Sequence, residues 1–177
     1  MLNDKYSSTI ILCLIDRVVD YLNNGFTILL ESDLVGLLMH SYLSDSNLDA
    51  KKIHIDTRIK QSNDAQKIDF AIGEVQYSDF SRPFIQPTIV IELKAIPEFG
   101  FTQSQKSKRF QYVLSDIEKL KKLNLSLSRW IVIFDGDNYF NNEKMKKIIQ
   151  HRNEQDRGIE MVVIKKENQK WTKFYYT

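Results

Sequence analysis

The stretch PTIVIELKA, residues 87–95, combines a nearly continuous apolar run with two opposite charges, Glu92 and Lys94. β-Branched and aliphatic residues at this density predict a strand inside a sheet, buried on both faces. Because side chains alternate along a strand, Glu92 and Lys94 share one face. Burying an unpaired charge is unfavourable, so we expect these two residues to be paired, to bind a metal or to line a cleft.

Periodic patterns on both sides of this strand predict the remaining elements. Helical spacing of apolar residues predicts helices over 7–23 and about 31–43, and further helices over 110–120 and 141–151. Alternating or apolar runs predict strands over 53–60, 66–74, 129–135 and 159–165, with a last strand over 170–176. A polar turn at 61–64 and a loop at 76–86 separate the first strands. The order αα-βββ-α-β-α-β predicts an α/β fold with a central mixed β-sheet flanked by helices.

Strand alternation also predicts which side chains lie together. One face of the strand over 53–60 is predicted to carry Ile53, Ile55, Thr57 and Ile59. In the following strand, Ile68, Phe70 and Ile72 are predicted to share a face opposite Asp69 and Ala71. In the strand over 87–95, Ile89, Ile91 and Leu93 are predicted to lie opposite Val90, Glu92 and Lys94.

Length and composition limit the classes of protein to consider. A chain of 177 residues with 42 % hydrophobic and 27 % charged positions is long enough for one core, so we expect a single domain over 1–177. A formal charge of +2 neither proves nor excludes a polyanionic partner. The single cysteine, Cys13, is expected in the core, and a cytoplasmic location without structural zinc is expected. No run approaches the ~18 apolar residues of a membrane span.

The charged strand gains a chemical interpretation from Asp69 on the preceding strand. Antiparallel pairing can bring Asp69 within a few ångströms of Glu92. Two adjacent carboxylates repel each other unless a cation lies between them, and hard oxygen donors suit Mg²⁺, with Mn²⁺ as a substitute. Lys94, on the same face as Glu92, would then orient a water molecule as the nucleophile.

These residues resemble the motif of the PD-(D/E)XK nuclease superfamily, which has the restriction-endonuclease-like fold. The resemblance covers about residues 25–165 and is carried by Asp69 in KIDFAIG, Glu92 and Lys94 in IVIELKA, and Glu31 in LLESDLVGLLMHSYL. Ile68 stands where the family commonly has proline. The resemblance implies Mg²⁺-dependent hydrolysis of phosphodiester bonds, in DNA rather than RNA, in restriction, repair, recombination or defence against mobile elements.

The same resemblance implies a role for each residue of the motif. Asp69, Glu92 and the backbone carbonyl of Leu93 would be the metal ligands. Lys94 would position the attacking water, and Glu31 would be a further catalytic residue that holds water or a second metal. Because one such site cuts one strand at a time, cleavage of both strands would require a homodimer or a larger complex.

Other interpretations of the same residues remain open. Lys106, Lys108 and Arg109 in QSQKSKRFQ could contact phosphates or form an ordinary solvated helix face. The charged residues of the strands could form a structural ionic cluster, and Glu31 could serve only the helix dipole. Lys119 and the other lysines of the helices are expected mainly to favour solubility. The alternative function is a non-catalytic or assembly-dependent nucleic-acid-binding module with a nuclease fold.

Overall fold

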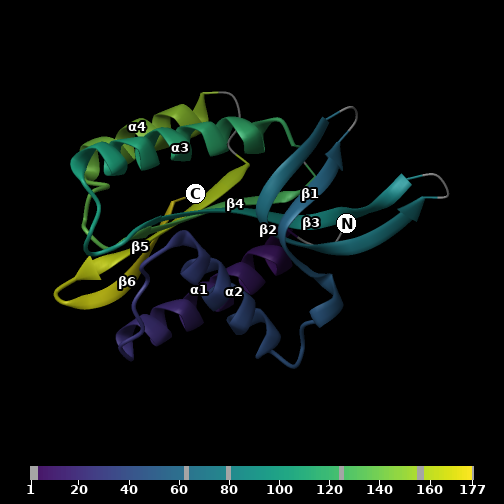
Figure 1. The fold of residues 1–177 in the computed structure, drawn as a ribbon, viewed down its shortest axis with the longest axis horizontal. Coiled ribbons are helices and arrows are strands. Elements are labelled where there is room, and N and C mark those ends of the chain that lie inside the picture. Colours follow the sequence, from purple (N-terminus) through teal and green to yellow (C-terminus); the bar gives the residue numbers. More distant parts are fainter. Residues whose placement is uncertain (1–3, 62–63, 79–80, 124–125, 155–157, 177) are drawn as a thin grey trace.

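The computed structural model describes residues 4–61, 64–78, 81–123, 126–154 and 158–176 (Figure 1). Four α-helices, one short 3₁₀ helix (η1) and six strands are found among them. Their bounds are α1 Asp4–Asn23, α2 Glu31–Leu43, η1 Ala50–Lys52, β1 Ile53–Gln61, β2 Asp64–Ser78, β3 Ser81–Ile96, α3 Gln103–Lys121, β4 Ser128–Asp135, α4 Asn142–Asn153, β5 Ile159–Glu167 and β6 Lys170–Tyr176. The predicted α/β order is confirmed, including the last strand.

The six strands form one mixed sheet in which spatial order follows chain order, β1 to β6. β1, β2 and β3 pair antiparallel, β3, β4 and β5 pair parallel, and β6 returns antiparallel to β5. The two parallel connections cross over through α3 and α4, as parallel neighbours require. β3 therefore lies where the antiparallel half of the sheet meets the parallel half.

Helices cover both faces of the sheet, with α1 and α2 on one side and α3 and α4 on the other (Figure 1). Each layer encloses its own apolar cluster. Ile89, Ile91 and Leu93 of β3 pack in the cluster with α1 and α2. Val90 packs in the cluster with α3 and α4. The predicted alternation of β3 is thus confirmed, and it directs Glu92 and Lys94 toward the α3 layer.

The predicted common face of β1 and the predicted place of Ile68 in β2 are wrong, whereas Phe70 and Ile72 lie opposite Ala71 as predicted. Ile59 and Ile68 are buried in the α3–α4 cluster, whereas Phe70 and Ile72 are buried in the α1–α2 cluster. The cause lies at Asp56, whose φ of 48° breaks the strand conformation. The β1–β2 ladder passes from the pair Ile55–Phe70 to the pair Thr57–Ile68 without a pair between them. The ribbon turns over at this point, so simple alternation fails.

Three further expectations need correction. Most of the predicted loop at 76–86 is strand, because β2 continues to Ser78 and β3 begins at Ser81, which makes a long hairpin (Figure 1). α3 begins at Gln103, before its apolar residues, because Thr102 and Gln105 form a capping box. Cys13 is exposed on the outer side of α1 and is not a core residue.

The helices in the described part of the chain include none that is long and apolar enough to cross a membrane.

Gly73 provides a test of how β2 and β3 are joined. A Cβ atom at this position would meet the carbonyl oxygen of Gln86 and lie 2.5 Å from Cα of Pro87, at a shift in the β2–β3 register. Because these are backbone atoms, Gly73→Ala should lower the free energy of unfolding by about 2–3 kcal/mol. Gly36→Ala is the control, since a Cβ on that helical glycine meets nothing within 4 Å and should stabilise the protein by up to about 1 kcal/mol. Urea unfolding measures both; an unchanged Gly73→Ala midpoint would contradict the close approach.

Candidate active site

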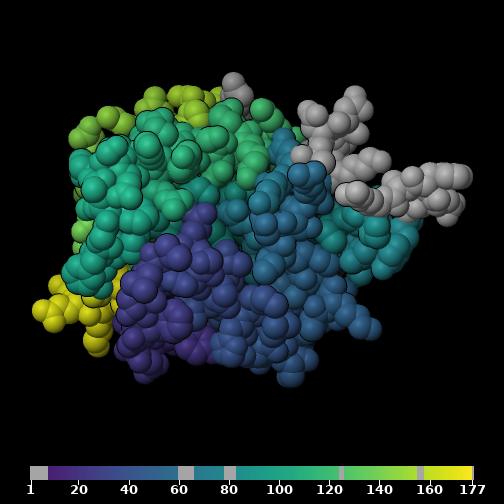
Figure 2. All heavy atoms as spheres, viewed as in Figure 1, coloured from purple at the N-terminus to yellow at the C-terminus, as the bar shows by residue number. Residues whose placement is uncertain are grey.

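Charged side chains from four elements converge beside the end of β3. Glu92 and Lys94 come from β3, and Asp69 comes from β2. Glu31 is the first residue of α2, and α3 covers the same region. Figure 2 shows α2 and α3 next to each other on one face of the molecule, with the β1–β2 ribbon beside them. The fold thus brings residues separated by up to 85 positions, 31 to 116, to one place.

Lys94 lies at the centre of this group. Its side chain is almost completely buried, and Nζ lies 2.9 Å from Oδ2 of Asp116, 3.6 Å from Oδ2 of Asp69 and 3.7 Å from Oε1 of Glu31. Nζ also donates a hydrogen bond of 2.7 Å to the carbonyl of Leu93. Burial alone would lower the pKa of Lys94, but the surrounding carboxylates outweigh it, and the pKa is raised. Lys94 is therefore a permanent ammonium near neutral pH.

Glu92 is the most buried carboxylate of the group, with 1 % of its surface exposed. Burial, together with repulsion from Asp69 and Asp116, raises its pKa to about 8, although Lys119 acts in the opposite direction. Lys119 Nζ lies 2.5 Å from Oε1 of Glu92. This lysine is the cationic group that faces the carboxylate. Glu92 is thus a buried carboxylate whose ionised form needs a cation beside it.

Asp69 interrupts the pairing between β2 and β3. The last backbone pair toward the site joins Phe70 and Ile91, and beyond it the Leu93 N–H donates to Oδ2 of Asp69 at 2.8 Å. The side chain thereby takes the place of a backbone acceptor and stays beside Glu92.

Glu31 is linked to α3 through Arg109. Nη1 of Arg109 lies 3.0 Å from Oε2 of Glu31, and its guanidinium group lies 5.7 Å from the centre of the Phe101 ring. Burial raises the pKa of Glu31, with Lys94 and Arg109 acting against the increase. Glu31 therefore does more than favour the dipole of α2, because it joins α2 to both β3 and α3.

The structure brings together Glu31, Asp69, Glu92, Lys94 and the Leu93 carbonyl, and their catalytic and metal-binding roles stay predictions. The three basic residues of α3 are distributed differently. Arg109 contacts Glu31, Lys106 forms an ion pair with Asp137, and Lys108 is exposed. Within the described residues, no carboxylate forms an ion pair with Lys108. Only Arg109 therefore joins the carboxylate group directly.

Sequence reasoning missed two residues of α3. Asp116 was not considered, and the expectation that Lys119 mainly favours solubility is wrong, since it contacts Glu92. Both residues lie next to the buried positions of the helix, which are occupied by Val113, Ile117 and Leu120. That spacing was visible in the sequence and would have placed Asp116 on the face of α3 that covers the sheet.

A divalent cation fits this group of side chains. Four carboxylates, Glu31, Asp69, Glu92 and Asp116, face three cationic side chains, Lys94, Lys119 and Arg109, so the ionised group carries one excess negative charge. Within the described residues, no set of three or more His, Cys, Asp or Glu side chains is arranged as a ready metal site. Mg²⁺ commonly takes only one or two carboxylates and keeps several waters, which agrees with Asp69 and Glu92 as a two-carboxylate site.

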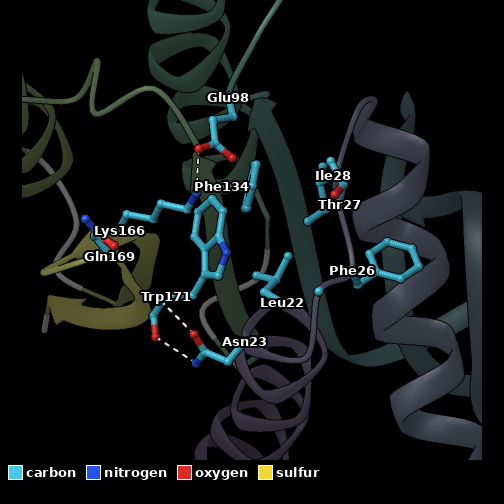
Figure 3. Close-up of a pocket in the computed structure, with 11 residues that line it drawn as sticks. Leu22, Asn23, Phe26, Thr27, Ile28, Glu98, Phe134, Lys166, Gln169 and Trp171 are labelled. Atoms are coloured by element: carbon cyan, nitrogen blue, oxygen red, sulfur yellow. Dashed lines mark hydrogen bonds and ion pairs between the residues drawn. The ribbon is translucent and has the colours of Figure 1, made fainter.

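A cavity of about 270 Å³ elsewhere has a different character (Figure 3). Lys166 and Glu98 form an ion pair on its wall, and the rings of Phe134 and Trp171 stack with centres 4.8 Å apart. The side-chain amide of Asn23 donates a hydrogen bond to the backbone carbonyl of Trp171 and accepts one from the backbone N–H of Trp171. These groups satisfy one another and fasten β6 to the end of α1, so we assign this cavity a structural role.

Comparisons with known proteins do not assign the chain to a family. No protein-family model matches the chain, and no curated protein matches it. Among solved structures, the chain is similar to SfsA of Pyrococcus furiosus in complex with Ca²⁺, with 12 % identity and a TM-score of 0.33. The match covers 81 % of this chain and 62 % of the SfsA chain, so it spans less than two thirds of that protein. We therefore base the functional proposal on this chain's own residues.

Glu92 should make the stability of the metal-free protein depend on pH. Its pKa is about 8 in the folded state against an ordinary 4.5, so its contribution to stability is complete below the unfolded value and is lost as pH rises through 8. Glu92→Gln should remove this loss, which is on the order of a few kcal/mol. Urea unfolding in EDTA at several pH values tests this, with the exposed Glu74→Gln on β2 as control. Parallel pH profiles for wild type and Glu92→Gln would contradict the buried-carboxylate assignment.

Proposed function

We propose that this chain is a Mg²⁺-dependent nuclease that hydrolyses phosphodiester bonds, with DNA preferred over RNA. The observation that carries the proposal is the buried ammonium of Lys94 beside Asp69 and Glu92 on adjacent strands. A structural ion pair would need one acid and one base. This group instead has more carboxylates than cations, and its most buried carboxylate has a raised pKa. The resemblance to the PD-(D/E)XK motif supports the same proposal.

Asp69 and Glu92, with the Leu93 carbonyl, would hold the metal. A bound Mg²⁺ would supply Lewis-acid polarisation of the phosphate and would lower the pKa of water. Lys119, which contacts Glu92, is the side chain that would compete with the cation for that carboxylate. Metal binding and the Lys119–Glu92 contact are thus alternatives, and the metal must replace the charge that Lys119 provides.

Lys94 would position the attacking water and stabilise negative charge on the phosphate. Because its pKa is raised, the ammonium acts as a hydrogen-bond donor and a positive charge, and it cannot act as a proton acceptor near neutral pH. Asp116, 2.9 Å away, fixes the position of this ammonium and is a positioning residue. Glu31 lies 3.7 Å from Nζ and would help to retain water.

A second function, a nucleic-acid-binding module that cleaves only within an assembly or not at all, is favoured by one observation. Lys94 and Lys119 already neutralise much of the charge of the proposed ligands, so the isolated chain is stable electrostatically without metal. Such a module would bind nucleic acid with the same affinity in the wild type and in Asp69→Ala. It would show no Mg²⁺-dependent cleavage by the purified chain.

Separate substitutions should divide metal binding from chemistry. Asp69→Ala should abolish Mg²⁺ binding measured by calorimetry, together with cleavage. Lys94→Ala should keep metal binding but lose on the order of 10²-fold to 10⁴-fold in single-turnover cleavage of DNA. Lys94→Arg should not restore the rate, since a planar guanidinium does not replace a compact ammonium. Lys147→Ala on α4, where the lysine is exposed, is the control. Wild-type cleavage by Lys94→Ala at saturating Mg²⁺ would show that the lysine is structural.

The basic residues of α3 are proposed to contact phosphates. Replacing Lys106, Lys108 and Arg109 together by Gln should weaken DNA binding for all sequences and reduce the salt dependence of binding by about two to three units, at roughly 0.9 per phosphate contact. Anisotropy titrations at several salt concentrations measure this slope. Lys108→Gln alone should lower it by about one unit, because Lys108 is exposed and Arg109 is shared with Glu31. An unaltered slope would show that these residues do not contact phosphates and form an ordinary solvated helix face.

A further inference from the structure

A cavity of about 360 Å³ opens beside the candidate active site, between α2 and the β1–β2 ribbon. Glu31 and Asp69, two of the proposed catalytic residues, form part of its wall. The cavity and the carboxylate group therefore share residues and are continuous. A ligand in this cavity would therefore lie directly next to the phosphodiester that the proposed nuclease would cleave.

The remaining wall of the cavity is mainly apolar. Val35, Gly36 and Met39 line it from α2, and Ile55 lines it from β1. Ile55 is 45 % exposed, whereas Ile59 of the same strand is fully buried. A phosphate group gains nothing from an apolar wall, whereas the flat face of a nucleobase is stabilised by one. The chemistry of the wall thus fits a base and not the phosphate backbone.

We infer that this cavity receives the base of an unpaired nucleotide next to the scissile phosphate, so that the substrate is single-stranded or locally unpaired nucleic acid. The inference rests on the proposed nuclease function. A volume of about 360 Å³ lies at the lower end of the ~300–1,000 Å³ usual for small-molecule sites, which suits one nucleoside and excludes a duplex. A paired base would have to leave its stack to enter, at a cost that an unpaired base avoids.

Asp56 supplies a polar group at the same cavity. Its carboxylate forms an ion pair with Lys67, with 2.6 Å between Oδ1 and Nζ, and both side chains are largely exposed. A carboxylate accepts a hydrogen bond from the ring N3–H of thymine or from the exocyclic amino group of another base, and the lysine can donate to a base carbonyl. The cavity therefore combines an apolar wall for the face of a base with hydrogen-bonding groups for its edge.

Gly36 offers a way to fill the cavity without disturbing the fold. A Cβ at this position meets nothing within 4 Å, so the side chain of Gly36→Leu has room to project, and leucine favours a helix more than glycine does. Ile55→Ala removes part of the opposite wall. Leu43→Ala is the matched control, because Leu43 is 47 % exposed on α2 but does not line the cavity.

Binding and cleavage are measured on three probes: a short oligothymidine strand, an abasic strand of the same length and charge, and the matching duplex. Binding is followed by fluorescence anisotropy in Ca²⁺, and cleavage under single-turnover conditions in Mg²⁺. We expect the oligothymidine strand to bind about tenfold more tightly than the abasic strand, in keeping with the loss of one base contact. It should also be cleaved faster than the duplex.

Gly36→Leu should reduce oligothymidine binding to the level of the abasic strand and leave abasic binding unchanged. Ile55→Ala should also weaken oligothymidine binding. Leu43→Ala should bind all three probes as the wild type does. Equal binding of the first two probes, or an unaffected Gly36→Leu, would overturn the base-pocket inference. If all three probes were cleaved equally in a Lys94-dependent manner, the base pocket would be wrong and the nuclease proposal would stand. If nothing were cleaved, the nuclease proposal would fail, and the base dependence of binding would still decide the role of the cavity.

Discussion

The burial of one ammonium group, that of Lys94, organises the region around the end of β3. A buried positive charge is stable only with partners, and here the partners come from β2, α2 and α3. α2 and α3 belong to helix layers on opposite faces of the sheet, so the charge ties the two layers together at one edge (Figure 1). Loss of any one partner would remove a stabilising contact from an ammonium group that is almost completely buried. The positions of the carboxylates are therefore coupled to one another.

The parts of the structure that depend on uninterrupted periodicity could be predicted from the sequence. β3 alternates as expected because both of its faces are buried in regular packing, and Glu31 was expected at the start of a helix and is found there. The faces of β1 and β2 could not be predicted, because the left-handed conformation of Asp56 is a property of the folded ribbon. The hairpin at 76–86 was missed because its polar residues and Pro83 are typical of a loop.

The candidate site was predictable as far as it lies on strands. Asp69, Glu92 and Lys94 are charges within apolar runs, and such charges are conspicuous. Asp116 and Lys119 lie in the charged segment SDIEKLKK, where an inward carboxylate looks like any other solvated residue unless helical phase is followed. Their contacts with Lys94 and Glu92 require the packing of α3 on the sheet, a long-range relation that no local pattern contains.

The agreement between spatial and chain order in the sheet has a consequence for synthesis on the ribosome. Each strand can pair with its predecessor as it emerges, and no strand must be inserted later between two others. Until α3 and β4 have been made, however, the side of β3 that later pairs with β4 is an open edge of the nascent antiparallel meander. Glu92 and Lys94 then serve as gatekeeper charges that discourage pairing with a neighbouring chain, before the same two residues become enclosed.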